Sequence, residues 1–272
     1  VEASYIVYPD DPANPSMYYA KNGKTGVTEY SSSDASDAIQ YSIDRATVYG
    51  GVVQLLPGVY TVYPTIKSIA IKSNTCVKGS PNTVFRVRFP DPPTTSPNDT
   101  FAVRIEDVFN ARVSDIVFEL YGYGGVSDYM PGVIKIDRSE KVLVEDVEVL
   151  DKRGSLPDAP WFSGIHIGYW GIMDRRNRDI VVRRCKLVTD GRQNRAFMGI
   201  RISSAERVLV EDCYLKGREL DEPYNSKIGY APIQIWSSDY VHLRGVTVVG
   251  GHHNLITTGV YNPSVDTNNV LI

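Results

Sequence analysis

Basic or potentially basic residues recur at one position of a short strand pattern, and they are the first candidates for chemistry in this sequence. The pattern is Ile-x-Ile or Val-x-Ile, and the middle residues of successive copies are Arg104, Lys135, His166, Arg201 and Gln234. Alternate residues of a strand point to opposite faces, so these middle residues should point outward as one row. Such a row would face a polyanionic chain lying along the stack of strands.

Lys135 lies between Arg104 and His166 in this row. Positive neighbours disfavour the charged form of a lysine and lower its pKa, which would make the amine of Lys135 a base. We therefore take Lys135, Arg201 and His166 as candidate catalytic residues, and Arg104 and Gln234 as candidate substrate contacts. The alternative is a solvated basic stripe without a ligand, and the sequence leaves it open.

Aromatic and acidic residues are concentrated in the long segments that separate the repeats. Aromatic faces suit stacking on sugar rings, and carboxylates suit hydrogen bonds to sugar hydroxyls. Candidate substrate-binding residues from these segments and the adjoining strand ends are Tyr129, Trp161, Trp170, Asp190, Tyr230 and Trp236. The alternative is that these aromatic side chains pack the segments onto the sheet.

The strands that carry these residues belong to a repeat. Copies begin at residues 103, 134, 165, 200, 233 and 256, and each holds two or three short stretches of period 2. Strands this short need neighbouring copies to bury their apolar faces, so the repeat predicts stacked coils with long parallel sheets. We predict an all-β, single-stranded parallel β-helix (solenoid) with an inward ladder formed by Ile105, Ile136, Ile167, Ile202 and Ile235.

Charged residues give an independent prediction of the register. Glu145, Arg183, Glu211 and Arg244 occupy equivalent outward positions in consecutive copies. Opposite charges should therefore alternate up the outside of one sheet, where cross-strand pairs stabilise the ladder. If Glu145 and Arg183 are not neighbours across a parallel ladder, this register is wrong.

Residues upstream of the repeat predict a capping element. Residues 34–46 begin with cap residues and place Ala35, Ile39, Ile43 and Ala46 on one face, which predicts an amphipathic helix. The first coil of a solenoid needs a cover, so we expect an N-terminal capping α-helix. The predicted organisation is an extended lead-in over residues 1–33 and one β-helix domain over residues 34–272, which ends in mid-coil.

Composition excludes several function classes. The chain has 272 residues, a formal net charge of −3 and no apolar run of membrane-spanning length. We therefore expect no membrane span and no nucleic-acid partner. The start at Val1 without a leader favours a mature secreted product, and the end in mid-coil predicts a homo-oligomer or filament through that coil.

The segment around the predicted helix resembles a known superfamily. Its entry segment is similar to that of the pectin-lyase-like right-handed β-helices, which include polygalacturonases, pectate lyases and phage or archaeal-virus tailspike-like proteins. The similarity rests on Asp34, Ala35, Ala38, Ile39, Gln40, Ile43 and Asp44, followed by Gly50, Gly51, Val52, Val53, Leu55, Pro57, Gly58 and Tyr60. The resemblance covers roughly residues 19–272 and implies a right-handed β-helix.

The polygalacturonase motifs of that superfamily are not matched. The slots before Ile165, Ile200 and Ile233 lack the carboxylate pair that inverting hydrolysis requires. Only Gly199 to Ile202 matches the last motif of those enzymes, without its lysine. We therefore exclude standard polygalacturonase activity.

A lyase chemistry is the other activity that the resemblance implies. Lyases of this superfamily use Lys or Arg as the base, often with Ca²⁺ on nearby carboxylates. The candidate metal ligands are then Asp128 and Asp158, with Asp137 as a further carboxylate, and Ca²⁺ is the candidate cofactor.

We predict an extracellular protein, secreted or on a virion or cell surface, that binds a polysaccharide. Whether it also cleaves the polysaccharide is left open by the sequence; an enzyme of this kind would be a lyase that acts on an anionic glycan by β-elimination, or a glycoside hydrolase. The alternative is a non-catalytic structural or adhesive protein, such as a filament subunit, a tailspike or a surface-layer-associated protein. Unsaturated products from a polyanionic glycan would separate the two.

Overall fold

A computed structural model of the chain consists mainly of short β-strands. It describes residues 2–47, 50–89, 100–122, 131–152, 162–168, 177–189, 197–217, 232–249, 256–259 and 268–271. Within these residues the strands form three sheets, here named A, B and C, together with one helix, α1 (Ala35–Ala46). No helix in this part of the chain is long and apolar enough to cross a membrane.

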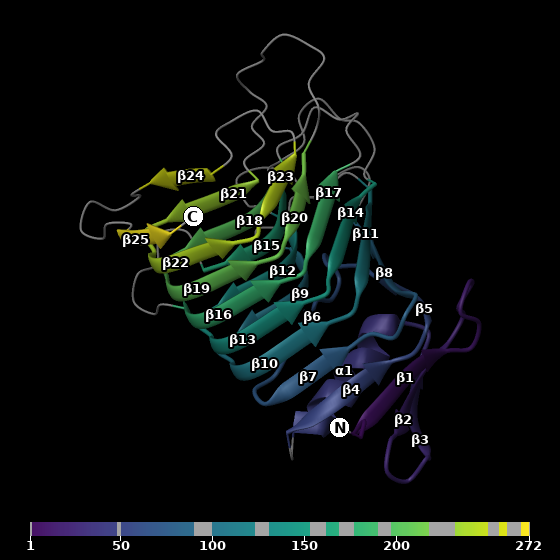
Figure 1. Cartoon of the computed structure of the whole chain (residues 1–272). Helices are drawn as coiled ribbons and strands as arrows, with labels where there is room; N and C mark the ends of the chain where they lie inside the picture. The colour runs from purple at the N-terminus through teal and green to yellow at the C-terminus, as the bar shows by residue number, and fades with distance from the viewer. Residues whose placement is uncertain are drawn as a thin grey trace.

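From β4 onward, successive strands enter sheets A, B and C in turn, and one strand from each sheet makes a level (Figure 1). Sheet A runs in the order β3 (Thr28–Ser32), β2 (Tyr18–Asn22), β1 (Tyr5–Pro9), β4 (Gly51–Leu55), β7 (Thr75–Lys78), β10 (Phe109–Ser114), β13 (Glu140–Glu145), β16 (Asn177–Arg183), β19 (Ala205–Glu211), β22 (Asp239–Arg244) and β25 (Asn268–Leu271). Sheet B contains β5 (Gly58–Val62), β8 (Thr83–Arg88), β11 (Val117–Tyr121), β14 (Glu148–Asp151), β17 (Lys186–Thr189), β20 (Tyr214–Lys216) and β23 (Thr247–Val249). Sheet C contains β6 (Ile69–Ala70), β9 (Phe101–Glu106), β12 (Gly132–Asp137), β15 (Phe162–Ile167), β18 (Phe197–Ser203), β21 (Ile233–Trp236) and β24 (Ile256–Gly259).

The predicted fold class, a single-stranded right-handed parallel β-helix with an N-terminal capping helix, is wrong in this form. The structure is all-β with three sheets of mostly parallel strands, and sheet A is mixed. Strands β1, β2 and β3 precede α1; β2 pairs antiparallel with both β1 and β3, and β1 pairs parallel with β4. Sequence reasoning missed β3 because the Thr28–Ser32 segment has no apolar alternation and is largely exposed.

The N-terminal edge of each sheet meets a different partner. Strands β1 to β3 extend sheet A beyond β4. At sheet B, the Tyr18 hydroxyl donates to the Val59 carbonyl at 3.3 Å. At sheet C, the Gln40 amide of α1 donates to the Ala70 carbonyl at 3.1 Å and accepts from the Ala70 N–H at 2.8 Å. Backbone groups that would otherwise be open at these edges are thus hydrogen-bonded.

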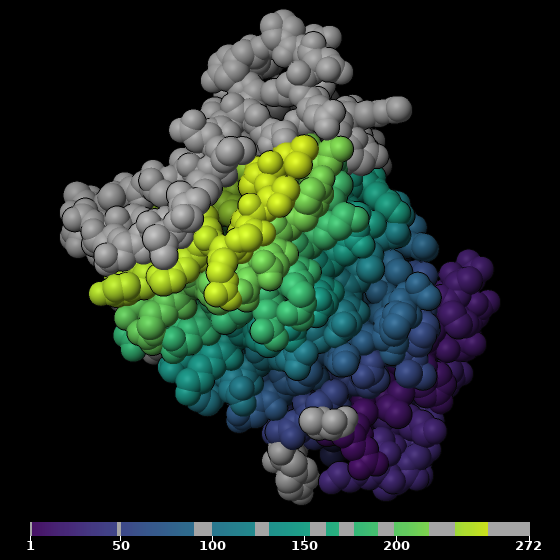
Figure 2. Space-filling view, viewed as in Figure 1, coloured from purple at the N-terminus to yellow at the C-terminus, as the bar shows by residue number. Residues whose placement is uncertain are grey.

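The predicted register is confirmed. Glu145 pairs with Arg183, Arg183 with Glu211, and Glu211 with Arg244, each across a parallel ladder. The inward isoleucine ladder is also confirmed across β9, β12, β15, β18 and β21, and all five of its side chains are buried. Figure 2 shows the levels as successive bands of colour across the visible face.

Glu145 is the member of the charge ladder with the most demanding surroundings. Its side chain is fully buried and forms ion pairs with Arg112, Arg183 and Arg184. The Arg183 Nε lies 2.6 Å and the Arg184 Nη2 lies 2.8 Å from Glu145 Oε2. Burial alone would raise the pKa of Glu145, but the hydrogen bonds from these arginines outweigh it and hold the pKa below its ordinary value.

Replacing Glu145 by Gln should lower the free energy of unfolding at neutral pH by about 1–3 kcal/mol, because a buried charged acceptor is lost among three cations. The folded pKa of Glu145 lies below its ordinary value of 4.5, so the contribution is present above that pH and is lost as pH falls through the folded value. Urea unfolding at pH 7 and at a pH below 4.5 should show that the difference in stability between the two proteins is smaller at the lower pH. Glu148→Gln, which breaks a surface pair with Lys186, is the control and should change stability by less than about 1 kcal/mol. A Glu145→Gln effect that is independent of pH would contradict this account.

Candidate functional site

The expected row of basic residues is present on sheet C as a register of equivalent positions. Ala70 pairs with Arg104, Arg104 with Lys135, and Lys135 with His166. The row continues through the pairs His166–Arg201 and Arg201–Gln234. Neighbouring members therefore stand about 4.8 Å apart along the stack of levels, the spacing of paired strands.

Most members of this row are buried, which their position on the outward side of the strands did not predict. Relative exposures are 3% for Lys135, 5% for His166, 1% for Arg201 and 8% for Gln234. Only the Arg104 side chain, at 37%, reaches solvent appreciably. Strands β12 and β15 are buried on both faces, whereas β13 and β14 alternate between buried and partly exposed positions. Period-2 patterning predicts only which face a residue lies on, not whether that face is covered.

Phe101 is one of the groups packed against the row. Its ring centroid lies 5.7 Å from the His166 ring and 5.8 Å from the Lys135 Nζ. Gly132 allows this packing, because a Cβ at that position would lie 2.2 Å from Phe101 Cε1. Farther along the row, the Arg201 guanidinium lies 5.4 Å from the Trp236 ring. The contacts of Lys135 with Phe101 and of Arg201 with Trp236 are of the cation–π type and stabilise cations that are removed from water.

His166 is the most perturbed group of the row. Both of its ring nitrogens are buried, and neither has a hydrogen-bond partner among the residues that the structure describes. Burial lowers the pKa of His166 well below 6.5, and the positive charges of Arg201 and Lys135 lower it further. The imidazole is therefore neutral at pH 7, and one of its nitrogens is a hydrogen-bond acceptor.

Two carboxylates, Glu106 and Asp137, occupy the outward positions that follow the inward ladder on β9 and β12. The sequence analysis did not identify Glu106. Glu106 pairs in register with Asp137. Glu106 accepts from Arg104 Nη2 at 2.6 Å, and its other oxygen lies 3.5 Å from Lys135 Nζ. Asp137 is buried and bonded to Arg138 Nη1 at 2.5 Å. Burial raises the pKa of Asp137, and the charge of Glu106 adds to that effect against the opposing charges of Arg138 and Lys135.

The signal for Glu106 was present in the sequence but was not used. Glu106 follows Ile105 as Asp137 follows Ile136, so both occupy the next outward position after the inward ladder. The argument about the charge state of Lys135 considered only its cationic neighbours, Arg104 and His166. The structure adds the carboxylate of Glu106 beside the Lys135 ammonium.

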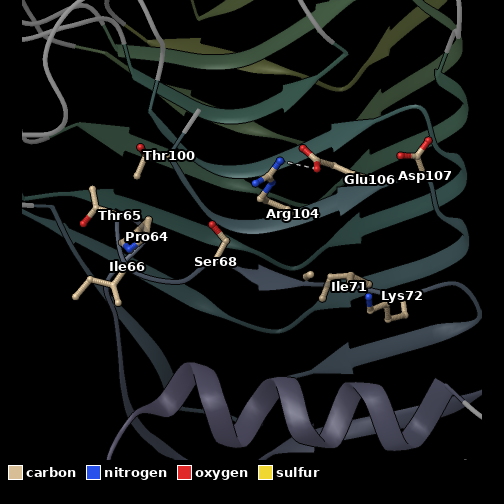
Figure 3. Close-up of a pocket in the computed structure, with 11 residues that line it drawn as sticks. Pro64, Thr65, Ile66, Ser68, Ile71, Lys72, Thr100, Arg104, Glu106 and Asp107 are labelled. Carbon is tan, nitrogen blue, oxygen red and sulfur yellow. Dashed lines mark hydrogen bonds and ion pairs between the residues drawn. The ribbon is translucent and has the colours of Figure 1, made fainter. Parts of the chain in front are cut away.

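A cavity of about 510 Å³ opens at the N-terminal end of the row. Arg104, Glu106 and Asp107 line it from β9 and the turn after β9, and Lys72 lines it from the segment after β6. Figure 3 shows Pro64, Thr65 and Ile66 on the opposite side, with the Arg104–Glu106 ion pair facing the space between. The polar lining suits a hydroxyl-rich ligand.

Several predicted site residues lie outside the described residues, and their placement stays a prediction. These are the substrate-binding candidates Tyr129, Trp161, Trp170, Asp190 and Tyr230 and the metal candidates Asp128 and Asp158. Within the ranges that the structure does describe, no group of three or more His, Cys, Asp or Glu side chains is arranged to hold a metal ion. Asp137 is engaged by Arg138 instead.

No protein-family model matches this sequence, and a comparison with curated proteins finds no relative. Solved structures, in contrast, share its architecture. A protein provisionally described as a glycosyl hydrolase, from Parabacteroides merdae, matches 78% of this chain and 89% of its own at 17% identity, with a TM-score of 0.54. The pre-mature gene product 12 of bacteriophage phi29 matches 85% of this chain at 17% identity, with a TM-score of 0.58.

A third similar structure is an iota-carrageenase of family GH82 from A. fortis. It matches 78% of this chain at 15% identity, with a TM-score of 0.51. The chain spans 46% of the carrageenase and 30% of the phage protein. At identities this low the likeness concerns the fold alone, and it supports the arrangement of parallel sheets described above.

His166 should make the stability of the protein depend on pH. Its pKa is lower in the folded than in the unfolded protein, so the unfolded chain binds the proton first as pH falls below about 6.5. The free energy of unfolding should therefore decrease on acidification, by at most about 1.4 kcal/mol per pH unit from this residue. Urea unfolding between pH 7.5 and pH 5.5 should show a smaller decrease in His166→Gln than in the parent.

The matched control for this measurement is His242→Gln, which replaces an exposed histidine of β22 and should leave the decrease unchanged. Equal pH dependence in the parent and in His166→Gln would show that His166 titrates as it does in the unfolded chain. That result would contradict the burial described here.

Proposed function

We propose that this chain binds an anionic polysaccharide along the outer face of sheet C and cleaves it by β-elimination. The observation that carries the proposal is the in-register row of Arg104, Lys135, His166 and Arg201, which places one basic side chain on each of four successive levels. A linear polyanion presents its charges at regular intervals, and the cations Arg104, Lys135 and Arg201 stand in register along the row, with the neutral His166 between Lys135 and Arg201.

The roles follow from the charge states of the row. His166, as a neutral imidazole, is the proposed base that removes the proton next to the carboxylate of a uronate. Lys135 and Arg201, in register on either side, would stabilise the negative charge that develops on that carboxylate. The electron pair forms a carbon–carbon double bond as the glycosidic carbon–oxygen bond breaks. The leaving oxygen then takes the proton from His166.

Access to His166 requires movement at the outer face of sheet C. His166 and Lys135 are buried and contact the Phe101 ring, whereas Arg104 is partly exposed and lines the cavity. We therefore place the first contact of the polysaccharide at Arg104, with displacement of the groups packed on His166 as the following step. Binding of the polymer and opening of this face are then coupled.

A sequence resemblance and two similar solved structures support the polysaccharide part of this proposal. The entry segment resembles the pectin-lyase-like superfamily, to which we assign the chain as part of the proposal. The structurally similar Parabacteroides merdae protein and the iota-carrageenase are described as a glycosyl hydrolase and a carrageenase. Polymers of this kind are met outside cells, so we also propose an extracellular location.

The test incubates the purified chain with polygalacturonate, alginate, iota-carrageenan and the neutral polymer dextran. Affinity electrophoresis measures binding, and ultraviolet absorbance measures unsaturated products. We expect binding to polyanions over dextran, and unsaturated product only from the two uronate polymers. His166→Gln should abolish the product while retaining binding, and Arg104→Gln should weaken binding by about tenfold.

The control variant is Lys186→Gln, which removes an exposed cation on sheet B and should leave both readouts unchanged. Thermal melting establishes that each variant is folded. Binding without product would favour the non-catalytic, adhesive alternative. Equal affinity for dextran and the polyanions would contradict the proposal as a whole.

A further inference from the structure

The cavity of about 510 Å³ at Arg104 follows a strand, whereas the row on sheet C crosses the strands. On the level of β9, its lining extends from Thr100, directly before the strand, to Asp107, directly after it. Six strand residues span about 20 Å, so the cavity is a groove along β9. The groove and the row therefore meet at Arg104, which belongs to both.

The groove has two arms, one on each side of Arg104 (Figure 3). The first, here named the hydroxyl arm, borders the row from the side, next to the turn at residues 63–67, and none of its lining residues is charged. These residues are Pro64, Thr65, Ile66, Ser68 and Thr100. The second, here named the charged arm, is lined by Lys72, Glu106 and Asp107.

The hydroxyl arm is formed by a turn that is held in place. At residues 63–67, the Ile66 and Lys67 N–H groups both donate to the Tyr63 carbonyl at 2.9 Å. Lys67 also forms an ion pair with Asp37 of α1, which ties the turn to the helix. A site whose walls are already ordered loses less conformational freedom when a ligand binds.

The lining of the hydroxyl arm suits an uncharged sugar. A hydroxyl group carries one donor and two acceptor lone pairs, so Thr65 and Ser68 match the hydroxyls of a sugar. The C–H groups of a sugar ring form an apolar face, and Ile66, which is 78% exposed, offers apolar surface at the edge of the arm. The arm provides no cation for an acidic unit.

The carboxylates of the charged arm are already engaged in ion pairs. Glu106 accepts from Arg104 Nη2 at 2.6 Å, and Asp107 accepts from Arg138 Nη2 at 2.8 Å. A ligand in this arm would have to compete with these bonds, so the hydroxyl arm is the better site.

We infer that the hydroxyl arm binds a neutral side branch of a polysaccharide whose acidic main chain lies along the row. The substrate class is then a branched acidic polysaccharide, and the branch leaves the main chain at the unit that contacts Arg104, where arm and row meet. This inference rests on the proposed function, because it takes the row as the binding face for the main chain. It goes further by specifying the branching of the polymer.

The first experiment compares rhamnogalacturonan I, which has an acidic main chain with neutral galactose branches, with the same polymer after a galactanase has trimmed those branches. Affinity electrophoresis should show that the protein binds the intact polymer at least about tenfold more tightly, because only the intact polymer fills the hydroxyl arm. Equal or weaker binding of the intact polymer would overturn the branch site and leave the proposed function standing. Failure to bind either polymer or polygalacturonate would contradict the proposed function itself.

The second experiment fills the hydroxyl arm. Ser68→Gln places a longer side chain there and should reduce the preference for the intact polymer from about tenfold to about onefold. Thr61→Gln is the matched control, because it enlarges a partly exposed residue of the first level on sheet B, outside the groove, and should keep the preference. Thermal melting establishes that both variants are folded. An unchanged preference in folded Ser68→Gln would overturn the inference.

Discussion

Parallel pairing in register is the constraint on which the rest of this structure depends. Once Ile105 lies beside Ile136, every other position of β9 must also lie beside its equivalent in β12. A residue type repeated in the sequence then becomes a row in space, about 4.8 Å per level. Repeated apolar residues give buried ladders, and repeated charges either alternate or accumulate.

Sheets A and C show the two outcomes for charge. On sheet A, Glu145, Arg183, Glu211 and Arg244 alternate, and the ladder neutralises itself through ion pairs. On sheet C, positively charged side chains flank the neutral His166 on both sides, and the compensating carboxylate of Glu106 lies near one end of the row. Self-neutralising ladders stabilise a fold, whereas a row in which positive charges predominate attracts a negatively charged ligand.

Burial makes the row on sheet C chemically distinct from an ordinary basic surface. The same removal from water lowers the pKa of His166 and raises the pKa of Asp137. Groups with shifted pKa values are common where proton transfer takes place. The two residues come from neighbouring levels, and Lys135 lies next to both of them, as the register partner of His166 and two residues before Asp137.

Much of this arrangement could be predicted from the sequence, and the reasons for the failures are physical. The pairing of Glu145 with Arg183 and the order of the row follow from spacing, because parallel strands translate spacing directly into neighbours. The burial of Lys135 and His166 could not be predicted in this way. Whether a sheet face is covered depends on side chains outside the repeated positions, such as Phe101. Strand β3 was missed because it pairs through its backbone without an apolar pattern.

The most direct test of this account is a crystal structure of the chain with a bound acidic oligosaccharide. The account predicts that the oligosaccharide lies along the outer face of sheet C, across the levels of β9, β12 and β15, in contact with Arg104. An oligosaccharide bound on sheet A or sheet B, with the row on sheet C still buried, would contradict it.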